Sequence, residues 1–192
     1  MCYGHQELYC ITIKNLYAVV ILIAGDTHTG KTLLAQKLLE KYNYPYLSID
    51  HLKMGLIRSG QCKLSADDND AELTSYLWPI IREIIKTCIE NDQNLILEGC
   101  YIPFGWEKDF STEYLQQIKY VCLIFSKGYI MNHFCDILYF EKVIEKRLFT
   151  DLIMEDLIKA NKYNLEQCTL RHYNYIFIDS DYKIDLDGIL NS

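Results

Sequence analysis

The sequence has little arginine. Four arginines occur in 192 residues, and the formal net charge is −7. Broad nucleic-acid-binding surfaces are basic, so this charge balance argues against a nucleic-acid partner. Recognition of an anion is therefore expected to be local and confined to a cleft.

The sequence also lacks the cysteine spacing of a zinc site or redox motif. Eight cysteines occur, and no two of them form a C-x-x-C pair. We predict buried free thiols in a reducing cytoplasm, with disulfides or zinc as the alternative. The first residues lack the basic start and cleavable apolar stretch of a signal peptide, and no apolar run approaches the ~20 residues of a membrane span. The prediction is a cytoplasmic protein with no membrane partner, and its oligomeric state stays open.

The length and composition fit one globular domain over residues 1–192, because half of the residues are hydrophobic and 23% are charged. Apolar runs alternate with helical patterns, which predicts a three-layer α/β domain with a parallel sheet. Pro79 is expected to kink or restart its helix. The predicted strands are 18–24, 44–50, 94–99, 119–126 and 175–179, with a small edge strand at 10–13. The predicted helices are 32–41, 51–58, 71–91 and 185–190, with 127–168 mostly helical and 59–70 a polar loop.

Residues 25–32 match the phosphate-binding P-loop pattern G-x-x-x-x-G-K-[ST] at every fixed position. A β-branched apolar run precedes them and helix formers follow, which is the context that this motif needs. Backbone N–H groups in such a loop wrap a phosphate, and the helix N-terminus adds partial positive charge. The alternative is a glycine-rich turn with a chance lysine. The predicted nucleotide-binding residues are Gly25, Asp26, Thr27, His28, Thr29, Gly30, Lys31 and Thr32.

Two acids follow predicted strands, at the sheet edge where ligands bind in open parallel sheets. Asp50 is placed to align a substrate hydroxyl or accept its proton, although a strand-final aspartate often only caps the next helix. Glu98 is placed to hold Mg²⁺ together with Thr32, while Lys31 reaches the β- and γ-phosphates. Gly99 leaves room for a ligand beside Glu98.

Three arginines are candidates for binding anions in the same cleft. Arg58 lies two helical turns beyond Asp50, and Arg82 lies on an amphipathic helix expected to line the pocket. Arg147, with weaker candidates at Lys142 and Lys146, lies in a charged stretch that could form a lid over the transferring group. Ordinary solvated helix faces are the alternative for all of them.

With these residues in hand, the chain resembles the P-loop small-molecule kinases of the adenylate, shikimate and gluconate kinase type. The segment LSIDHLKMGLIRSG is similar to the zeta-toxin and 2-phosphoglycerate-kinase-like branch. The resemblance implies a five-stranded sheet in the order 2-3-1-4-5, a helical lid at about 127–160, and ATP and Mg²⁺ as ligands. It also implies a substrate site near Asp50 and Arg58, and a loop at 179–182 that packs against adenine. The chain departs from the shikimate type, since no second acid lies two residues after Asp50, and its lid region has one arginine.

The function predicted from these features is ATP-dependent transfer of a phosphoryl group to a hydroxyl of a small metabolite. Lys31, Asp50 and Arg147 are the predicted catalytic residues. The predicted substrate-binding residues are Asp50, Arg58, Arg82, Glu98 and Gly99. A zeta-toxin-like amino-sugar kinase and a non-catalytic nucleotide-binding module are the alternatives. A GTPase is disfavoured, because the segment nearest to N-K-x-D, at 161–164, ends in asparagine.

Overall fold

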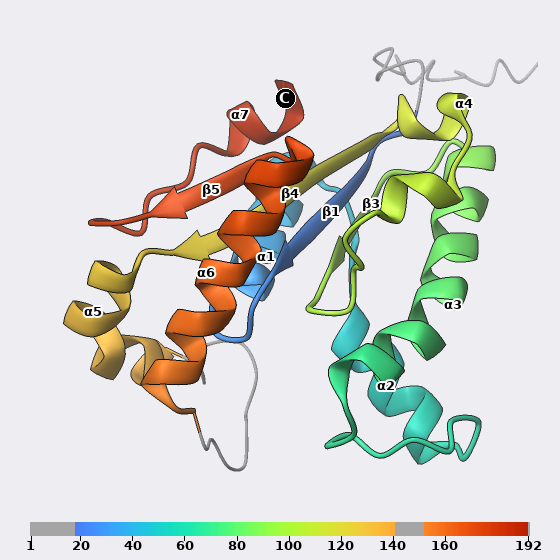
Figure 1. The fold of residues 1–192 in the computed structure, drawn as a ribbon. Coiled ribbons are helices and arrows are strands. Elements are labelled where there is room, and N and C mark those ends of the chain that lie inside the picture. Colours follow the sequence, from blue (N-terminus) through green and yellow to red (C-terminus); the bar gives the residue numbers. More distant parts are fainter. Residues whose placement is uncertain (1–17, 141–151, 192) are drawn as a thin grey trace, which may run out of the picture.

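The computed structural model describes residues 18–140 and 152–191. Five strands form one all-parallel sheet in the order β2-β3-β1-β4-β5 (Figure 1). This topology confirms the predicted α/β class and strand order. The strands are β1 (Val20–Gly25), β2 (Tyr46–Ser48), β3 (Leu95–Glu98), β4 (Ile118–Phe125) and β5 (Tyr175–Ile178).

The helices fall close to the predicted positions, and two short ones between β3 and β4 were not predicted. The bounds are α1 (Lys31–Tyr42), α2 (Ile49–Arg58), α3 (Asp70–Glu90), η1 (Trp106–Asp109), α4 (Thr112–Leu115), α5 (Lys127–Phe140), α6 (Met154–Arg171) and α7 (Leu186–Asn191). The predicted edge strand at 10–13 lies outside the described residues, as does 141–151 of the predicted lid.

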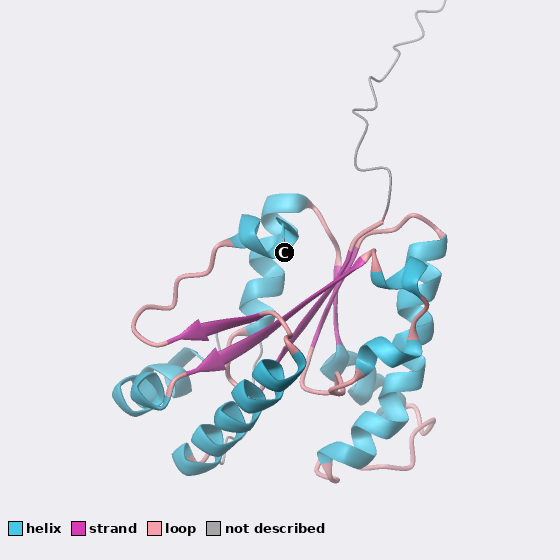
Figure 2. Cartoon of the chain, turned by 45° about the horizontal axis from the view of Figure 1, so that its top comes forward, coloured by secondary structure: helices cyan, strands magenta, loops and turns pink. Residues whose placement is uncertain are grey.

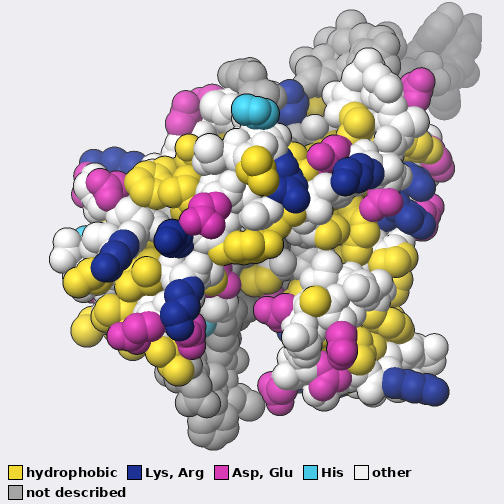
Figure 3. Space-filling model, in the orientation of Figure 1, with side chains coloured by type: hydrophobic (Ala, Val, Ile, Leu, Met, Phe, Trp, Pro, Cys, Tyr) yellow, Lys and Arg dark blue, Asp and Glu magenta, His cyan; other side chains and the backbone are white. Residues whose placement is uncertain are grey.

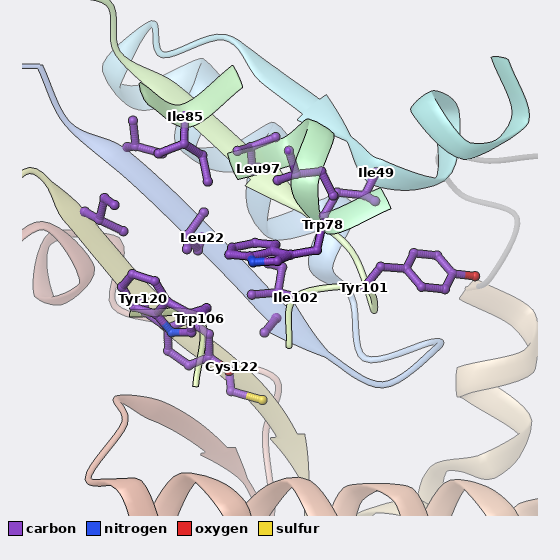
Figure 4. Close-up of a cluster of buried hydrophobic side chains, with 14 of the residues drawn as sticks. Leu22, Ile49, Trp78, Ile85, Leu97, Tyr101, Ile102, Trp106, Tyr120 and Cys122 are labelled. Carbon is purple, nitrogen blue, oxygen red and sulfur yellow. The ribbon is translucent and has the colours of Figure 1, made fainter. Parts of the chain in front are cut away.

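Alternating side chains of the central strand enter two separate cores, which gives the three layers visible in Figure 2. Val20 and Leu22 pack with α3, η1 and Cys168 of α6. Ile21 and Ile23 pack with α1 and α7 on the opposite face. Strands covered on both faces are apolar throughout, which is why β1 is a continuous hydrophobic run. Figure 4 shows the first core, where Leu22, Trp78 and Ile102 point toward one another.

The helix that contains Pro79 does not restart. α3 is one helix over 21 residues, although proline removes a backbone donor from its interior. Buried Leu77, Trp78 and Ile81 hold the turns on both sides of Pro79 against the sheet. This packing offsets the lost hydrogen bond, so the helix continues through Pro79.

The prediction that the cysteines are buried free thiols holds only in part. The six cysteines in the described ranges are all free, and Cys62, Cys122 and Cys168 are buried. Cys135 is exposed instead, because it lies on the outer face of α5. Within 18–140 and 152–191, no helix is long and apolar enough to span a membrane.

Candidate functional site

The P-loop connects the end of β1 to the start of α1, and its two fixed glycines have structural reasons to be glycine. Gly25 has a φ of 142°, and a Cβ there would lie 2.7 Å from the carbonyl oxygen of Leu123. Gly30 has a φ of 83°, and a side chain there would collide with the hydroxyl of Tyr182. Only glycine adopts such backbone conformations readily and leaves this space free.

The variable positions of the loop hold it in shape. The buried hydroxyl of Thr29 donates to the carbonyl oxygen of Asp26 at 2.8 Å. Thr27 Oγ1 and His28 Nδ1 lie 2.8 Å apart. His28 is half-buried and has a φ of 63°. Burial raises the pKa of the Asp26 carboxyl above its ordinary value, and a hydrogen bond from the Thr27 backbone opposes this shift.

Lys31, the invariant cation of the motif, is buried at the first position of α1. Its Nζ donates to the carbonyl oxygen of Asp26 at 2.7 Å. Burial alone would lower the pKa of Lys31, but Cys100, Glu98 and two further acids raise it above the ordinary value. The ammonium group therefore stays charged at neutral pH within a pocket of acidic side chains.

Glu98 and Thr32, both predicted to hold Mg²⁺, lie in contact. Glu98 ends β3 and is only 1% exposed, and its Oε1 accepts a hydrogen bond from Thr32 Oγ1 at 3.3 Å. Packing gives a further reason for a small residue at Gly99, beside the predicted room for a ligand. A Cβ there would lie 2.8 Å from Cβ of Ile49 in α2, so packing between β3 and α2 already requires glycine.

The helix that contains Asp50 begins two residues earlier than the sequence predicted, at Ile49. β2 ends at Ser48, so Asp50 belongs to the first turn of α2 and is not its N-cap. Its Oδ1 accepts from Lys53 Nζ at 2.8 Å, and the same Nζ donates to the Tyr101 hydroxyl at 2.8 Å. Figure 4 shows Tyr101 pointing away from the core with its hydroxyl outermost. The result is a connected Asp50–Lys53–Tyr101 triplet between α2 and the segment after β3.

Tyr182, from the loop after β5, packs on the P-loop. Its hydroxyl lies 3.2 Å from the carbonyl oxygens of both Thr29 and Gly30 and donates to them. Burial raises the pKa of this hydroxyl well above its ordinary value, so it remains a donor. The edge of its ring contacts Phe125 at a centroid distance of 6.2 Å. Through Tyr182, the loop that the resemblance assigned to adenine lies against the P-loop.

The predicted arginines are not all brought to this site. Arg58 is exposed at the last turn of α2. Arg82 pairs with Glu83 at 2.7 Å and lies 4.0 Å from Asp109, so its guanidinium is held by carboxylates on α3 and η1. Arg147 lies outside the described residues, together with Lys142 and Lys146.

The carboxyl ends of β1, β2 and β3 lie at one edge of the sheet (Figure 1). Acidic side chains are visible over the α2–α3 side of the molecule in Figure 3. A separate groove of about 750 Å³ lies between α3 and the loop after α2. None of the predicted site residues contributes to its lining, which comprises Gln61, Lys63, Leu64, Ala71, Glu72, Ser75 and Tyr76.

Sequence reasoning missed Lys53 and Tyr101. Lys53 had a detectable signal, because a lysine three residues after an aspartate on a helix can pair with it. Tyr101 had no such signal, since it lies 48 positions from Lys53 and only the sheet brings the two together.

Neither the protein-family models nor the curated proteins contain a match to this chain. Solved structures do match it over most of their length and at low identity. A gluconokinase from Sinorhizobium meliloti is 14% identical with a TM-score of 0.51, covering 91% of this chain and 89% of its own. A protein from Chloroflexus aurantiacus, provisionally assigned as a kinase, is 17% identical with a TM-score of 0.54, covering 91% and 96%.

A tunicamycin resistance protein from Deinococcus radiodurans is also similar, at 10% identity and a TM-score of 0.54, with coverage of 91% and 92%. At such identities a likeness establishes the fold and leaves the substrate open. P-loop small-molecule kinases are thus among the structural neighbours of this chain, and it has their fold.

Proposed function

We propose that this protein is an ATP-dependent phosphotransferase whose acceptor is a hydroxyl of a small molecule. The observation that carries the proposal is the convergence of three groups at one sheet edge. These are the P-loop with buried Lys31, the Thr32–Glu98 contact, and the Asp50–Lys53 pair. Phosphoryl transfer needs a phosphate cradle, charge neutralisation and an oriented nucleophile, and these groups fit the three needs in turn.

Thr32 and Glu98 fit a Mg²⁺ ion. Both offer oxygen atoms, and their mutual contact leaves them in one place at the start of α1. In the described part of the chain, no cluster of three His, Cys, Asp or Glu side chains could hold a metal by itself. This suits Mg²⁺, which is usually bound through one or two protein oxygens and otherwise by water and phosphate. When bound, Mg²⁺ neutralises charge on the phosphate oxygens.

Each of the protein's own residues would then have a separate role in the transfer. The backbone amides of the P-loop and the ammonium of Lys31 would bind the triphosphate in place of the Asp26 carbonyl that Lys31 now contacts. Asp50 would orient the acceptor hydroxyl and take its proton, with Lys53 fixing the carboxylate. Arg58 and Arg147 are proposed to contact the acceptor and the transferring group.

The test is release of ADP from Mg·ATP across a panel of hydroxylated metabolites, sugars, amino sugars, nucleosides and nucleotides. Lys31→Ala serves as the blank, because it removes the phosphate-binding cation and should abolish binding of ATP. Acceptor-stimulated turnover that vanishes in the blank is the expected result. Tight binding of ATP without stimulation by any acceptor would contradict the proposal and favour a nucleotide-binding module.

A further inference from the structure

Ser48 occupies the N-cap position of α2, but its side chain does not cap the helix. It directly precedes α2 in an extended conformation, with φ −77° and ψ 126°, which is the usual N-cap backbone. Its side chain nevertheless makes no capping hydrogen bond. Ser48 is only 1% exposed, and its Oγ has no hydrogen-bond partner in the described part of the chain.

A buried hydroxyl without a hydrogen-bond partner destabilises the folded protein. We therefore expect Ser48 Oγ to find its partner in a bound group from outside the protein. Only two buried side-chain atoms of the described residues lack a partner, Ser48 Oγ and Trp106 Nε1. The second lies within the aromatic cluster of η1, far along the chain from the P-loop. The first lies at the edge of the sheet where the P-loop and Glu98 meet.

The strand register places Ser48 beside the candidate metal site. Ser48 of β2 is the direct partner of Glu98 in β3. Paired residues of neighbouring strands present their side chains on the same face of the sheet. On that face, the Glu98 carboxylate contacts Thr32 in the first turn of α1. Two hydroxyls and one carboxylate, from three different elements, therefore share one side of the sheet edge.

We propose that the Ser48 hydroxyl completes the Mg²⁺ site by hydrogen-bonding a water molecule that the ion carries. This inference rests on the proposed function, because it needs the ion that Thr32 and Glu98 would hold. Mg²⁺ gives up its water reluctantly and keeps several molecules when bound to protein. Groups that hold such outer ligands typically contribute between about ten- and a hundredfold to metal affinity. A small hydroxyl that can both donate and accept suits this role.

The experiment measures binding of Mn²⁺, as a paramagnetic substitute for Mg²⁺, by electron paramagnetic resonance in the presence of ADP. Ser48→Ala is expected to weaken Mn²⁺ binding about tenfold or more. Its affinity for ADP in EDTA should stay unchanged, since the hydroxyl is not expected to contact the nucleotide. Its melting temperature should not fall, because no hydrogen bond within the protein is lost.

Ser126→Ala is the matched control. Ser126 is also buried, and it directly precedes α5, but its Oγ accepts from the Tyr129 backbone N–H at 2.9 Å. Removing this cap should lower the melting temperature and leave Mn²⁺ affinity unchanged. The same change from serine to alanine should thus lower Mn²⁺ affinity alone at Ser48 and the melting temperature alone at Ser126.

The possible results distinguish the proposed role of Ser48 from the proposed function. If Ser48→Ala binds Mn²⁺ as the wild type does, the role of Ser48 is overturned and the proposed function stands. If the wild type binds no Mn²⁺ with ADP, the proposed function itself fails. Ser48→Cys, which is close in size and a weak hydrogen-bonding group, repeats the test if the alanine variant does not fold, and wild-type Mn²⁺ affinity in it would equally overturn the inference.

Discussion

The Asp50–Lys53 ion pair offers the sharpest test of how the acceptor side is organised. Replacing Lys53 with methionine keeps most of the side-chain volume and removes the ammonium. Asp50 then loses the ammonium that lies 2.8 Å from its Oδ1, and the Tyr101 hydroxyl loses a donor at the same distance. The substitution therefore leaves a carboxylate in the first turn of α2 without the charge that fixes it.

The size of the effect follows from the geometry. At 2.8 Å, two unit charges attract by roughly 6 kcal/mol at an effective dielectric constant of about 20. Desolvation of Lys53, whose side chain is 11% exposed, offsets a large part of this attraction. Water reaches Asp50, which is 32% exposed, and screens the charge that remains. We expect a loss of about 2 kcal/mol in the free energy of unfolding, or about 4–8 °C in Tm.

The assay combines thermal denaturation with steady-state kinetics on the acceptor that the panel identifies. Besides the loss of stability, kcat should fall between about ten- and a hundredfold, because the carboxylate is no longer held in one orientation. Lys53→Arg should recover part of both quantities, since it restores the positive charge with a different shape.

Lys41→Met is the matched control. Lys41 pairs with Asp187 at 2.7 Å, which is nearly the same distance, but both side chains are largely exposed. Exposed pairs contribute little, so this variant should melt close to the wild type and keep its kcat. Equal melting temperatures for Lys53→Met and Lys41→Met, together with unchanged kcat, would refute the reasoning.

Three further predictions follow from the same geometry. Asp50→Asn should leave binding of ATP intact, as calorimetric titration would measure, and reduce kcat by about a hundredfold or more, as rapid-quench kinetics would measure. An unchanged kcat would show that Asp50 does not act at the acceptor site. Burial lowers the pKa of Lys53, but its bonds to Asp50 and Tyr101 raise it above the ordinary 10.5. A base whose pKa rises on folding stabilises the protein only while it is protonated. The stability advantage of the wild type over Lys53→Met, measured by urea titrations, should therefore be full below pH 10.5 and disappear at higher pH. An advantage that persists at higher pH would contradict this assignment. Tyr182→Phe removes the donor to the P-loop carbonyls and should weaken nucleotide binding several-fold without abolishing it, as fluorescence titration would show; wild-type affinity would mean that this contact does not shape the loop.

The residues that were predicted from the sequence are those whose role depends on neighbours along the chain. The P-loop is eight consecutive residues between a strand and a helix, so its pattern predicted where the loop lies in the fold. Glu98 was singled out because a predicted strand ends in an acid, and its role at a metal ion stays a prediction. Local order was enough for these features.

Features that depend on side chains meeting across the fold were not predictable. Arg82 was expected in the pocket because its helix is amphipathic, but Asp109 and Glu83 hold it instead. Tyr101 joins the site from a segment with no local motif, while the loop of Tyr182 was expected at adenine through the resemblance and its contact with the P-loop was not. The unpaired hydroxyl of Ser48 becomes visible only once strand register and helix capping are known together.

Phosphorus-31 magnetic resonance of Mg·ATP, with the protein and the acceptor that stimulates release of ADP, tests the central claim most directly. The prediction is that the γ-phosphorus signal is replaced by that of a phosphate monoester while ADP accumulates, and that Lys31→Ala produces neither. Conversion of the γ-phosphorus signal to inorganic phosphate alone, or its persistence unchanged, would contradict a phosphotransferase.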